Sequence, residues 1–429
     1  MKKLLTAFAA SAVALTGVAS AQTYAITNGH LMVTGDAEAP QEITNGTVLI
    51  RDGIIMAVGR NVTIPENAEV FDAGGTPITP GLFSPLSGLA LDEISLAQDA
   101  NDRSVGDVPM SASLKAADAI NPDSTVIPIS RSAGVTRAFT TLNASGDSHF
   151  AGCGAVIVLD TSMDPVIREC AAHMAVLGYA GARRAGDNRA ASLAMFRRAL
   201  DDARDYANDP ILYRQRLREG HLSADDASAL GPVLRGDVPL MVDVESAPDI
   251  LRTLDLADEY GLDLVIVGGT EAYRVADELA EADVPVILNP MVNLPYLFEQ
   301  MGATLAAGGL LEEAGVKVAF SDDDTHNIRL MPQLAGNAVA NGMSHQGALA
   351  AITAVPAIIF GVDQTHGTLA PGKAADVVVW SGDPLEVTSR PRLVFIDGRP
   401  QSLDNRQTAL AKRYRNLERQ ELPPTYLGQ

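Results

Sequence analysis

The chain has 429 residues, of which 32 are Lys or Arg and 53 are Asp or Glu, and its formal net charge is −21 at pH 7. This excess of negative charge repels nucleic-acid phosphates and anionic lipid, so we expect neither nucleic acid nor a membrane as a partner. The length exceeds what one hydrophobic core usually supports, which predicts two domains or one large barrel with an appendage.

The first 21 residues have the organisation of a secretory signal peptide. Two lysines, at positions 2 and 3, precede an apolar run from Leu4 to about Val18, and the small residues of 19–21 follow. The apolar run is shorter than the roughly 20 residues of a membrane-spanning helix, so export is favoured over an anchor. The two lysines are the only charged side chains that cleavage after Ala21 would remove, so the formal net charge would change from −21 to −23. We therefore expect a mature protein that is periplasmic or secreted.

Short β-rich runs occupy both ends of the mature chain. They lie at 24–29, 47–53 and 54–59 near the start, and at 375–380 and 393–398 near the end. Three Asn-Gly or Asp-Gly pairs predict tight turns, at 28–29, 45–46 and 52–53. We expect one β-sandwich domain assembled from 22–79 and 367–400, followed by a helical tail over 401–429.

The middle of the chain alternates apolar strands with amphipathic helices. The expected strands cover 240–242, 264–267, 286–288 and 316–320, and the expected helices cover 248–260, 271–282 and 332–341. This α/β alternation favours a TIM-like (β/α)8 barrel over 80–366, with a helical insertion at about 182–231. A doubly wound open sheet is the alternative, although no G-x-G-x-x-G motif begins the first unit.

Two motifs at the junctions between these predicted domains resemble the amidohydrolase superfamily. Residues 71–82 read FDAGGTPITPGL, and residues 367–380 read GTLAPGKAADVVVW, with GDPL at 382–385. They resemble the runs that lead into the first barrel strand and back to the β-sandwich in that superfamily. The segments 119–123, 134–136 and 247–250 look like an imidazolonepropionase-related bacterial subgroup.

This resemblance implies a hydrolase of carbon–nitrogen bonds other than peptide bonds. It implies a small-molecule ligand such as an amide, a lactam or a dipeptide-like compound. Many barrels of the family are dimers, so a homodimer is possible, but the sequence leaves the oligomeric state and the substrate open.

Metal-ligand positions of the family are the point at which this chain departs from it. Members hold divalent metal, typically zinc, at the C-terminal mouth of the barrel, where imidazoles and carboxylates leave one position for a water. The resemblance places the first two histidines of the family at Leu86 and Gly88 and a later one at Gly268. None of these side chains offers a donor atom. We therefore expect either no metal or a hard divalent cation in place of zinc.

Three acidic residues are candidates for chemistry at this mouth. Asp322 matches the family's carboxylate at the end of strand eight, which acts as general base and acid. Asp243 and Glu245 stand where relatives have His-x-His, and two residues apart on a strand they point to one side. With Asp322 they could hold calcium, magnesium or manganese. Alternatively, these acids are hydrogen-bonded to helix N-termini or arginines, which would relieve their mutual repulsion.

Two histidines could also face the mouth. His326 stands four residues after Asp322, and His149 lies on a predicted loop. The sequence thus predicts an amidohydrolase-like hydrolase with a lost or rebuilt metal centre, and its alternative is a catalytically inactive binding or structural protein of the periplasm. Cys153 and Cys170 are the two cysteines, and an oxidising compartment permits a disulfide between them, although separate buried thiols are equally compatible with the sequence.

Overall fold

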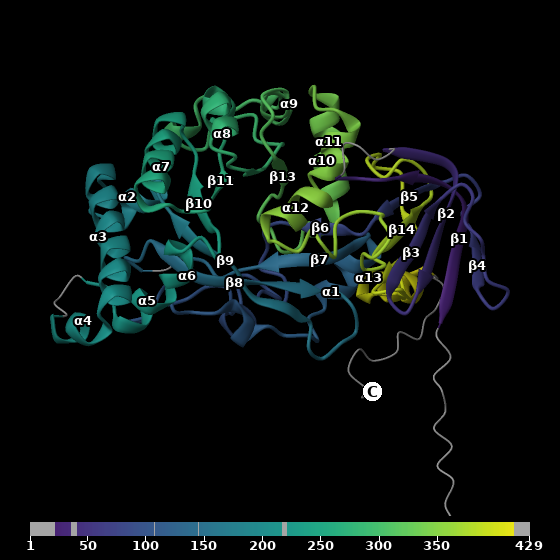
Figure 1. Ribbon diagram of the computed structural model, residues 1–429, viewed down its shortest axis with the longest axis horizontal. Coiled ribbons are helices and arrows are strands. Elements are labelled where there is room, and N and C mark those ends of the chain that lie inside the picture. The colour runs from purple at the N-terminus through teal and green to yellow at the C-terminus, as the bar shows by residue number, and fades with distance from the viewer. Residues whose placement is uncertain (1–21, 36–40, 107, 145, 217–220, 416–429) are drawn as a thin grey trace, which may run out of the picture.

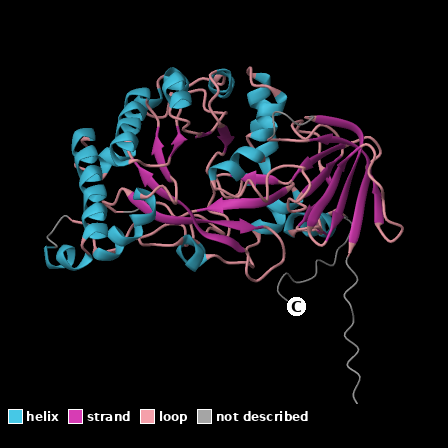
Figure 2. Cartoon of the chain, viewed as in Figure 1, coloured by secondary structure: helices cyan, strands magenta, loops and turns pink. Residues whose placement is uncertain are grey.

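The computed structural model describes residues 22–35, 41–106, 108–144, 146–216 and 221–415. The predicted signal peptide lies outside these residues. Their strands form two sheets of eight strands each. Figure 2 shows one sheet as a fan at one end of the molecule and the other as a curved wall flanked by helices. Within the described part of the chain, no helix is long and apolar enough to cross a membrane.

The fan is built from both ends of the chain, as predicted (Figure 1). Its strand order is β16-β15-β14-β5-β1-β2-β3, and β4 pairs with β1. The strands are β1 (Thr23–Met32), β2 (Glu42–Arg51), β3 (Ile54–Gly59), β4 (Glu69–Asp72), β5 (Pro77–Pro80), β14 (Val377–Trp380), β15 (Pro391–Ile396) and β16 (Arg399–Pro400). Tyr24 in β1 meets Phe395 in β15 with ring centroids 5.2 Å apart. The predicted sandwich is therefore one continuous sheet whose two halves share a core.

Two of the three predicted tight turns are wrong. Asp52 and Gly53 do form the turn between β2 and β3, with φ of 52° and 84°. Asn28 lies inside β1 and Asn45 inside β2, each with φ of 54°, and the pairing register of β1 with β2 shifts on both sides of Gly29. Positive φ serves a β-bulge as well as a hairpin turn, so an Asn-Gly pair does not distinguish the two.

The second sheet is a nearly closed, TIM-like barrel, and the predicted α/β fold is confirmed. Its strands run in chain order from β6 to β13. They are β6 (Leu82–Ser84), β7 (Val135–Thr140), β8 (Phe150–Val158), β9 (Val166–Val176), β10 (Leu240–Val244), β11 (Leu264–Gly268), β12 (Val286–Leu288) and β13 (Val318–Phe320). A hydrogen bond from Ser321 Oγ to the Leu86 carbonyl, 2.9 Å long, bridges the ends of the two outer strands.

One strand departs from the all-parallel pattern. β8 runs antiparallel to both β7 and β9, whereas β9 to β13 are parallel neighbours. Only residues 159–165 connect β8 with β9, and a connection this short cannot return the chain for parallel pairing. The β8–β9 hairpin therefore replaces one βα unit of the expected barrel.

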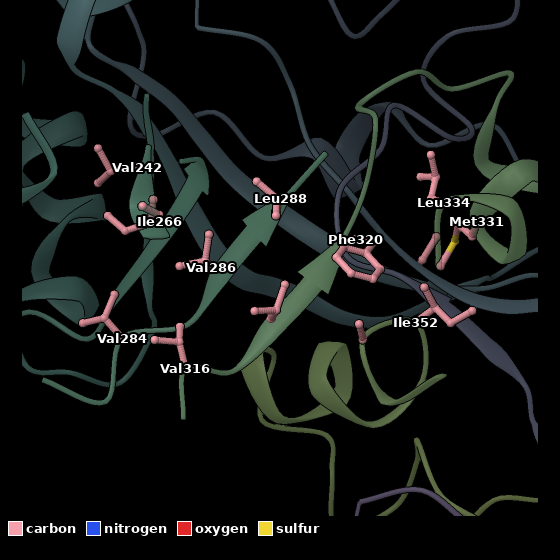
Figure 3. Close-up of a cluster of buried hydrophobic side chains, with 14 of the residues drawn as sticks. Val242, Ile266, Val284, Val286, Leu288, Val316, Phe320, Met331, Leu334 and Ile352 are labelled. Carbon is pink, nitrogen blue, oxygen red and sulfur yellow. The ribbon is translucent and has the colours of Figure 1, made fainter. Parts of the chain in front are cut away.

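Helices cover the outer face of the barrel (Figure 1). Those that follow the later strands are α7 (Ala247–Tyr260), α8 (Ala276–Glu281), α9 (Ala307–Glu313), α10 (Met331–Ala340), α11 (His345–Ala350) and α12 (Ala354–Ile359). The segment between β9 and β10 holds α2 (Gly178–Arg183), α3 (Arg189–Asn208), α4 (Pro210–Arg216), α5 (Ala224–Ala229) and α6 (Gly231–Leu234). The remaining α-helices are α1 (Val126–Ser132) and α13 (Arg406–Tyr414). Figure 3 shows Val242, Ile266 and Val286 of successive strands in the core between sheet and helices.

A buried arginine joins the barrel to the fan. Arg137, on β7, has a side chain only 2% exposed. Its Nε donates to Asp376 at 2.7 Å, and one terminal nitrogen donates to Asp376 at 3.1 Å and to Asp397 at 2.6 Å. Burial by itself would raise the pKa of Asp376, but the guanidinium overcomes this effect and holds the pKa below its usual value. Arg137 of the barrel and the two aspartates of the fan thus form a charged contact between the sheets, in which each charge is stabilised by the opposite one.

Candidate functional site

The site is built at the ends of the barrel strands, starting from Asp243 on β10. Met241, two residues earlier, belongs to the apolar cluster inside the barrel, as does Val267, the partner of Asp243 on β11. Alternate residues of a strand point to the same side, so Asp243 points into the barrel above Met241.

Asp243 sits in an environment that disfavours its charge. Burial raises the pKa of its carboxyl to about 7, with further increases from Glu245, Asp323 and Glu299, partly opposed by Arg184. A carboxyl group whose pKa is raised this far is no longer fully ionised at neutral pH. It can therefore both donate and accept a proton under ordinary conditions.

The carboxylate of Glu245 is held by Thr270. One of its oxygens accepts hydrogen bonds from the Thr270 amide at 2.9 Å and from the Thr270 hydroxyl at 2.5 Å. Its carboxylate also covers Gly268, where an added Cβ would lie 2.7 Å from Glu245 Oε1. The sequence alternative for this acid was a hydrogen bond to a helix N-terminus or to an arginine, and the observed partner is Thr270, which precedes the short helix Ala272–Val275.

Asp322 lies on the segment after β13. Burial raises the pKa of its carboxyl, and the carboxylates of Asp324 and Asp323 add to this, whereas a hydrogen bond from the Asp324 amide opposes it. Within the segment 322–324, it is Asp323, and not Asp322, whose carboxylate contributes to the raised pKa of Asp243. Asp323 adopts a positive φ of 56°, an uncommon conformation for a residue with a side chain. Asp323, the residue after the predicted Asp322, therefore belongs with Glu245 and Glu299 to the acids that act on Asp243.

A buried arginine, Arg103, packs against Gly88, where the resemblance places a histidine. An added Cβ at Gly88 would lie 2.8 Å from Nε of Arg103 and 2.8 Å from Oγ1 of Thr325. Arg103 forms an ion pair with the carboxylate of Asp323 and donates to the Asp323 carbonyl at 3.0 Å. Leu86 is 4% exposed and belongs to the same interior cluster as Phe83. The mouth thus holds a fixed guanidinium beside the vacated ligand position.

These residues do not fit a zinc ion at the mouth. Leu86, Gly88 and Gly268 have no donor atoms, and an imidazole at Gly88 would displace Arg103. The only group of three or more His, Cys, Asp or Glu with ligand atoms within 4.8 Å of one another, in the part of the chain that the structure describes, is Cys153, Cys170 and His173. Among the described residues, Asp243, Glu245 and Asp322 do not form such a group.

In the described part of the chain, neither candidate histidine has a hydrogen bond or ion pair with Asp243, Glu245 or Asp322. His326 is exposed, and its backbone amide donates to Asp324 at 2.8 Å. His149 is buried, its Nε2 is 2.8 Å from the Ser192 hydroxyl, and burial lowers its pKa to about 4. Neither contributes to the electrostatics of Asp243.

Four charged residues of the site were not predicted from sequence, namely Arg103, Arg184, Glu299 and Asp323. Asp323 was within reach of prediction, because it adjoins Asp322 in an acidic triplet. Arg103 and Glu299 carry no local signal. Glu299 accepts hydrogen bonds from the Tyr179 amide at 2.8 Å and from Arg189 at 2.9 Å, which are contacts across 120 and 110 residues.

Replacing Gly88 by alanine should destabilise the protein by about 1–3 kcal/mol, since the new methyl group overpacks the stem of Arg103. Urea unfolding of the purified protein measures the loss. The double variant Gly88→Ala, Arg103→Ala removes the obstructing side chain and should show a positive coupling between the two changes. Strictly additive losses would contradict the close approach of residues 88 and 103.

Comparison with known proteins identifies relatives over most of the chain. Residues 302–403 match the sequence profile of the Amidohydrolase family. The amidohydrolase tasK of Hapsidospora irregularis is 25% identical over 397 residues, which are 83% of this chain. The chain spans about 40% of the length of that curated relative.

Solved structures share the fold. The crystal structure of an amidohydrolase from Thermotoga maritima MSB8 superimposes with a TM-score of 0.77 at 25% identity, covering 88% of this chain and 99% of that one. A molinate hydrolase gives a TM-score of 0.55 at 18% identity, covering 89% of this chain and 95% of that one, and shows likeness of fold.

Proposed function

The chain belongs to the amidohydrolase superfamily, and from this premise we propose that it hydrolyses carbon–nitrogen bonds other than peptide bonds at a rebuilt, metal-free centre. The observation that carries the proposal is Asp243, a carboxyl group with a pKa of about 7 that points into the barrel. Its position corresponds to the first residue of a His-x-His pair in the resembling subgroup. The bound compound would be a small amide, lactam or dipeptide-like molecule.

The proposed chemistry is proton transfer by carboxyl groups. Ionised Asp243 takes a proton from the water that attacks the carbonyl carbon, and the protonated group then delivers it to the departing nitrogen. The carbon–nitrogen bond breaks, and an amine and a carboxylic acid result. Asp322, whose pKa is also raised, is the second proposed proton-transfer group. Arg184 partly offsets the negative charge around Asp243.

A second candidate function is ligand binding without turnover. The packing of Arg103 against Gly88 and its pairing with Asp323 favour it, because a guanidinium there supplies charge for recognition but activates no water. In that case the barrel would be a catalytically inactive binding or structural protein. The two candidates differ in whether product forms.

A panel of amides, lactams, amidines and dipeptides, assayed with and without a chelator under non-reducing conditions, tests the proposal. We expect turnover that survives the chelator and falls by about 100-fold or more in Asp243→Asn and Asp322→Asn, the usual range for loss of a proton-transfer group. Turnover that requires stoichiometric metal would contradict the metal-free centre. Saturable binding without product would favour the second candidate.

Export to the periplasm is part of the same proposal. It rests on the charged, apolar and small-residue order of positions 1–21. N-terminal sequencing of the mature protein from the periplasmic fraction should begin at Gln22, and an intact Met1 there would contradict cleavage.

A further inference from the structure

Cys153, Cys170 and His173 form a cluster on the β8–β9 hairpin, away from the acids of the mouth. The two cysteines form a disulfide with their Cα atoms 5.3 Å apart. His173 is the cross-strand partner of Cys153, and one ligand atom of each of the three residues lies within 4.8 Å of the others. The sequence left this bridge open, and the structure forms it together with an imidazole that the spacing alone did not reveal.

The imidazole of this cluster has no partner for one of its nitrogens. His173 is 1% exposed, and its Nδ1 is buried without a hydrogen bond. Burial lowers its pKa to about 4, so the ring is neutral at pH 7. An unsatisfied polar atom in a protein interior is destabilising unless it binds something, and neutral imidazole nitrogen is a common zinc ligand. One imidazole nitrogen of His173 is therefore without a partner while the sulfurs are joined.

We propose that reduction of the Cys153–Cys170 disulfide opens a Cys2His site for a thiophilic cation such as Zn²⁺. Two thiolates and one imidazole are a ligand set that suits zinc and leaves a fourth position for water or another ligand. Carboxylates, which prefer harder ions, take no part. The disulfide keeps the site closed in an oxidising compartment.

The chemistry balances with an external dithiol as reductant. Its thiolate attacks one sulfur of the disulfide, a mixed disulfide forms, and its second thiol resolves this intermediate. The products are two cysteine thiols in the protein and one disulfide in the reductant. Binding of Zn²⁺ then releases the two thiol protons to solvent. Cys170 is half-buried whereas Cys153 is buried, so Cys170 is the accessible point of attack.

The cluster lies on a different face of the sheet from the proposed reaction site. His173 pairs with Leu240 on β10, and Leu240 belongs to the outer core between sheet and helices. The next pair, Met174 with Met241, belongs to the cluster inside the barrel, where Asp243 points. The two proposals can therefore fail independently.

Zinc titration of the mature protein, before and after treatment with dithiothreitol and its removal, tests the site. Thiol titration first counts the free cysteines, and a chromophoric chelator then competes for Zn²⁺. We expect one Zn²⁺ per reduced chain, bound at least about 100-fold more tightly than by the oxidised chain. Loss of a residue that only supports a metal ligand already weakens metal binding by about 10- to 100-fold, and the disulfide removes two ligands themselves. Cobalt substitution should give a sulfur-to-metal charge-transfer absorption.

Variants separate this site from other zinc-binding groups. His173→Gln should weaken zinc binding by the reduced chain by about 10-fold or more, and Cys153→Ser, Cys170→Ser should abolish it. The matched control is His149→Gln, which removes another buried imidazole whose pKa is about 4 and should leave zinc affinity unchanged. Equal affinity of the oxidised and reduced chains, or a disulfide that resists reduction in the folded protein, would overturn the proposal. Should His173→Gln fail to fold, absence of the cobalt–sulfur absorption in the reduced wild-type protein would overturn it too.

Discussion

Replacing Arg137 by methionine should lower the free energy of unfolding by about 3–5 kcal/mol, the loss expected when one partner of a buried ion pair is removed. The change leaves the buried carboxylate of Asp376 without the guanidinium that now holds its pKa down. The apolar stem of methionine preserves much of the volume, so the loss reports mainly on charge. Urea unfolding followed by circular dichroism measures it.

The matched control is Arg183→Met, which breaks an exposed ion pair with Asp187. A surface pair of this kind contributes at most about 1 kcal/mol, and often much less. The double variant Arg137→Met, Asp376→Leu should recover much of the loss, because no uncompensated charge then remains. Equal unfolding midpoints for Arg137→Met and Arg183→Met would refute a structural role for the buried pair.

The stability lost in Arg137→Met should depend on pH. In the wild type the pKa of Asp376 is depressed by folding, so its contribution is present above the unfolded pKa and is lost as pH falls through the folded one. In Arg137→Met burial would instead raise the pKa of Asp376. The gap between variant and wild type should therefore narrow on acidification, as the lone carboxylate becomes protonated.

Replacing Asp243 by asparagine should lower turnover by about 100-fold or more and at the same time stabilise the protein at alkaline pH. The folded pKa of Asp243, about 7, lies above its ordinary value, so the unfolded state releases this proton first as pH rises. Wild-type stability should therefore decline between about pH 4 and pH 7 and stay reduced above that range. The neutral amide removes the effect, which we expect to be about 1–3 kcal/mol at pH 8 and negligible at pH 4.

Asp263→Asn is the control for Asp243→Asn. Burial also raises the pKa of Asp263, with a contribution from Asp283, but Asp263 precedes β11 at the opposite end of the barrel strand. It should gain stability at alkaline pH without losing turnover. If Asp243→Asn becomes more stable but loses activity, Asp243 is a residue that serves the reaction and lowers the stability of the folded protein. An Asp243→Asn variant that keeps full activity would remove Asp243 from the proposed mechanism.

Much of the architecture was predictable because its signals are local. The alternation of apolar strands and amphipathic helices predicted the barrel, and the strand at 286–288 coincides with β12. The β-rich ends predicted the composite sheet. The direction of β8 was not predicted, because it depends on the short connection to β9 and not on the pattern within either strand.

The sequence by itself determined that Leu86, Gly88 and Gly268 have no side-chain donor atom for a metal. That these positions correspond to the family's histidines remains an inference from the resemblance. Alternation along the strand determined only that Asp243 and Glu245 point to the same side, and the packing of Met241 and Val267 shows that this side is the barrel interior.

Only the tertiary structure decided which side chains surround these positions and which distant residues meet. Arg103 reaches Asp323 across 220 residues, Glu245 turns to Thr270, and His173 lies opposite Cys153 on a neighbouring strand. Such contacts follow from strand register and from competition among many possible partners for each charge. Periodicity along the chain reports which side a residue faces, but it does not report which distant side chain meets it there.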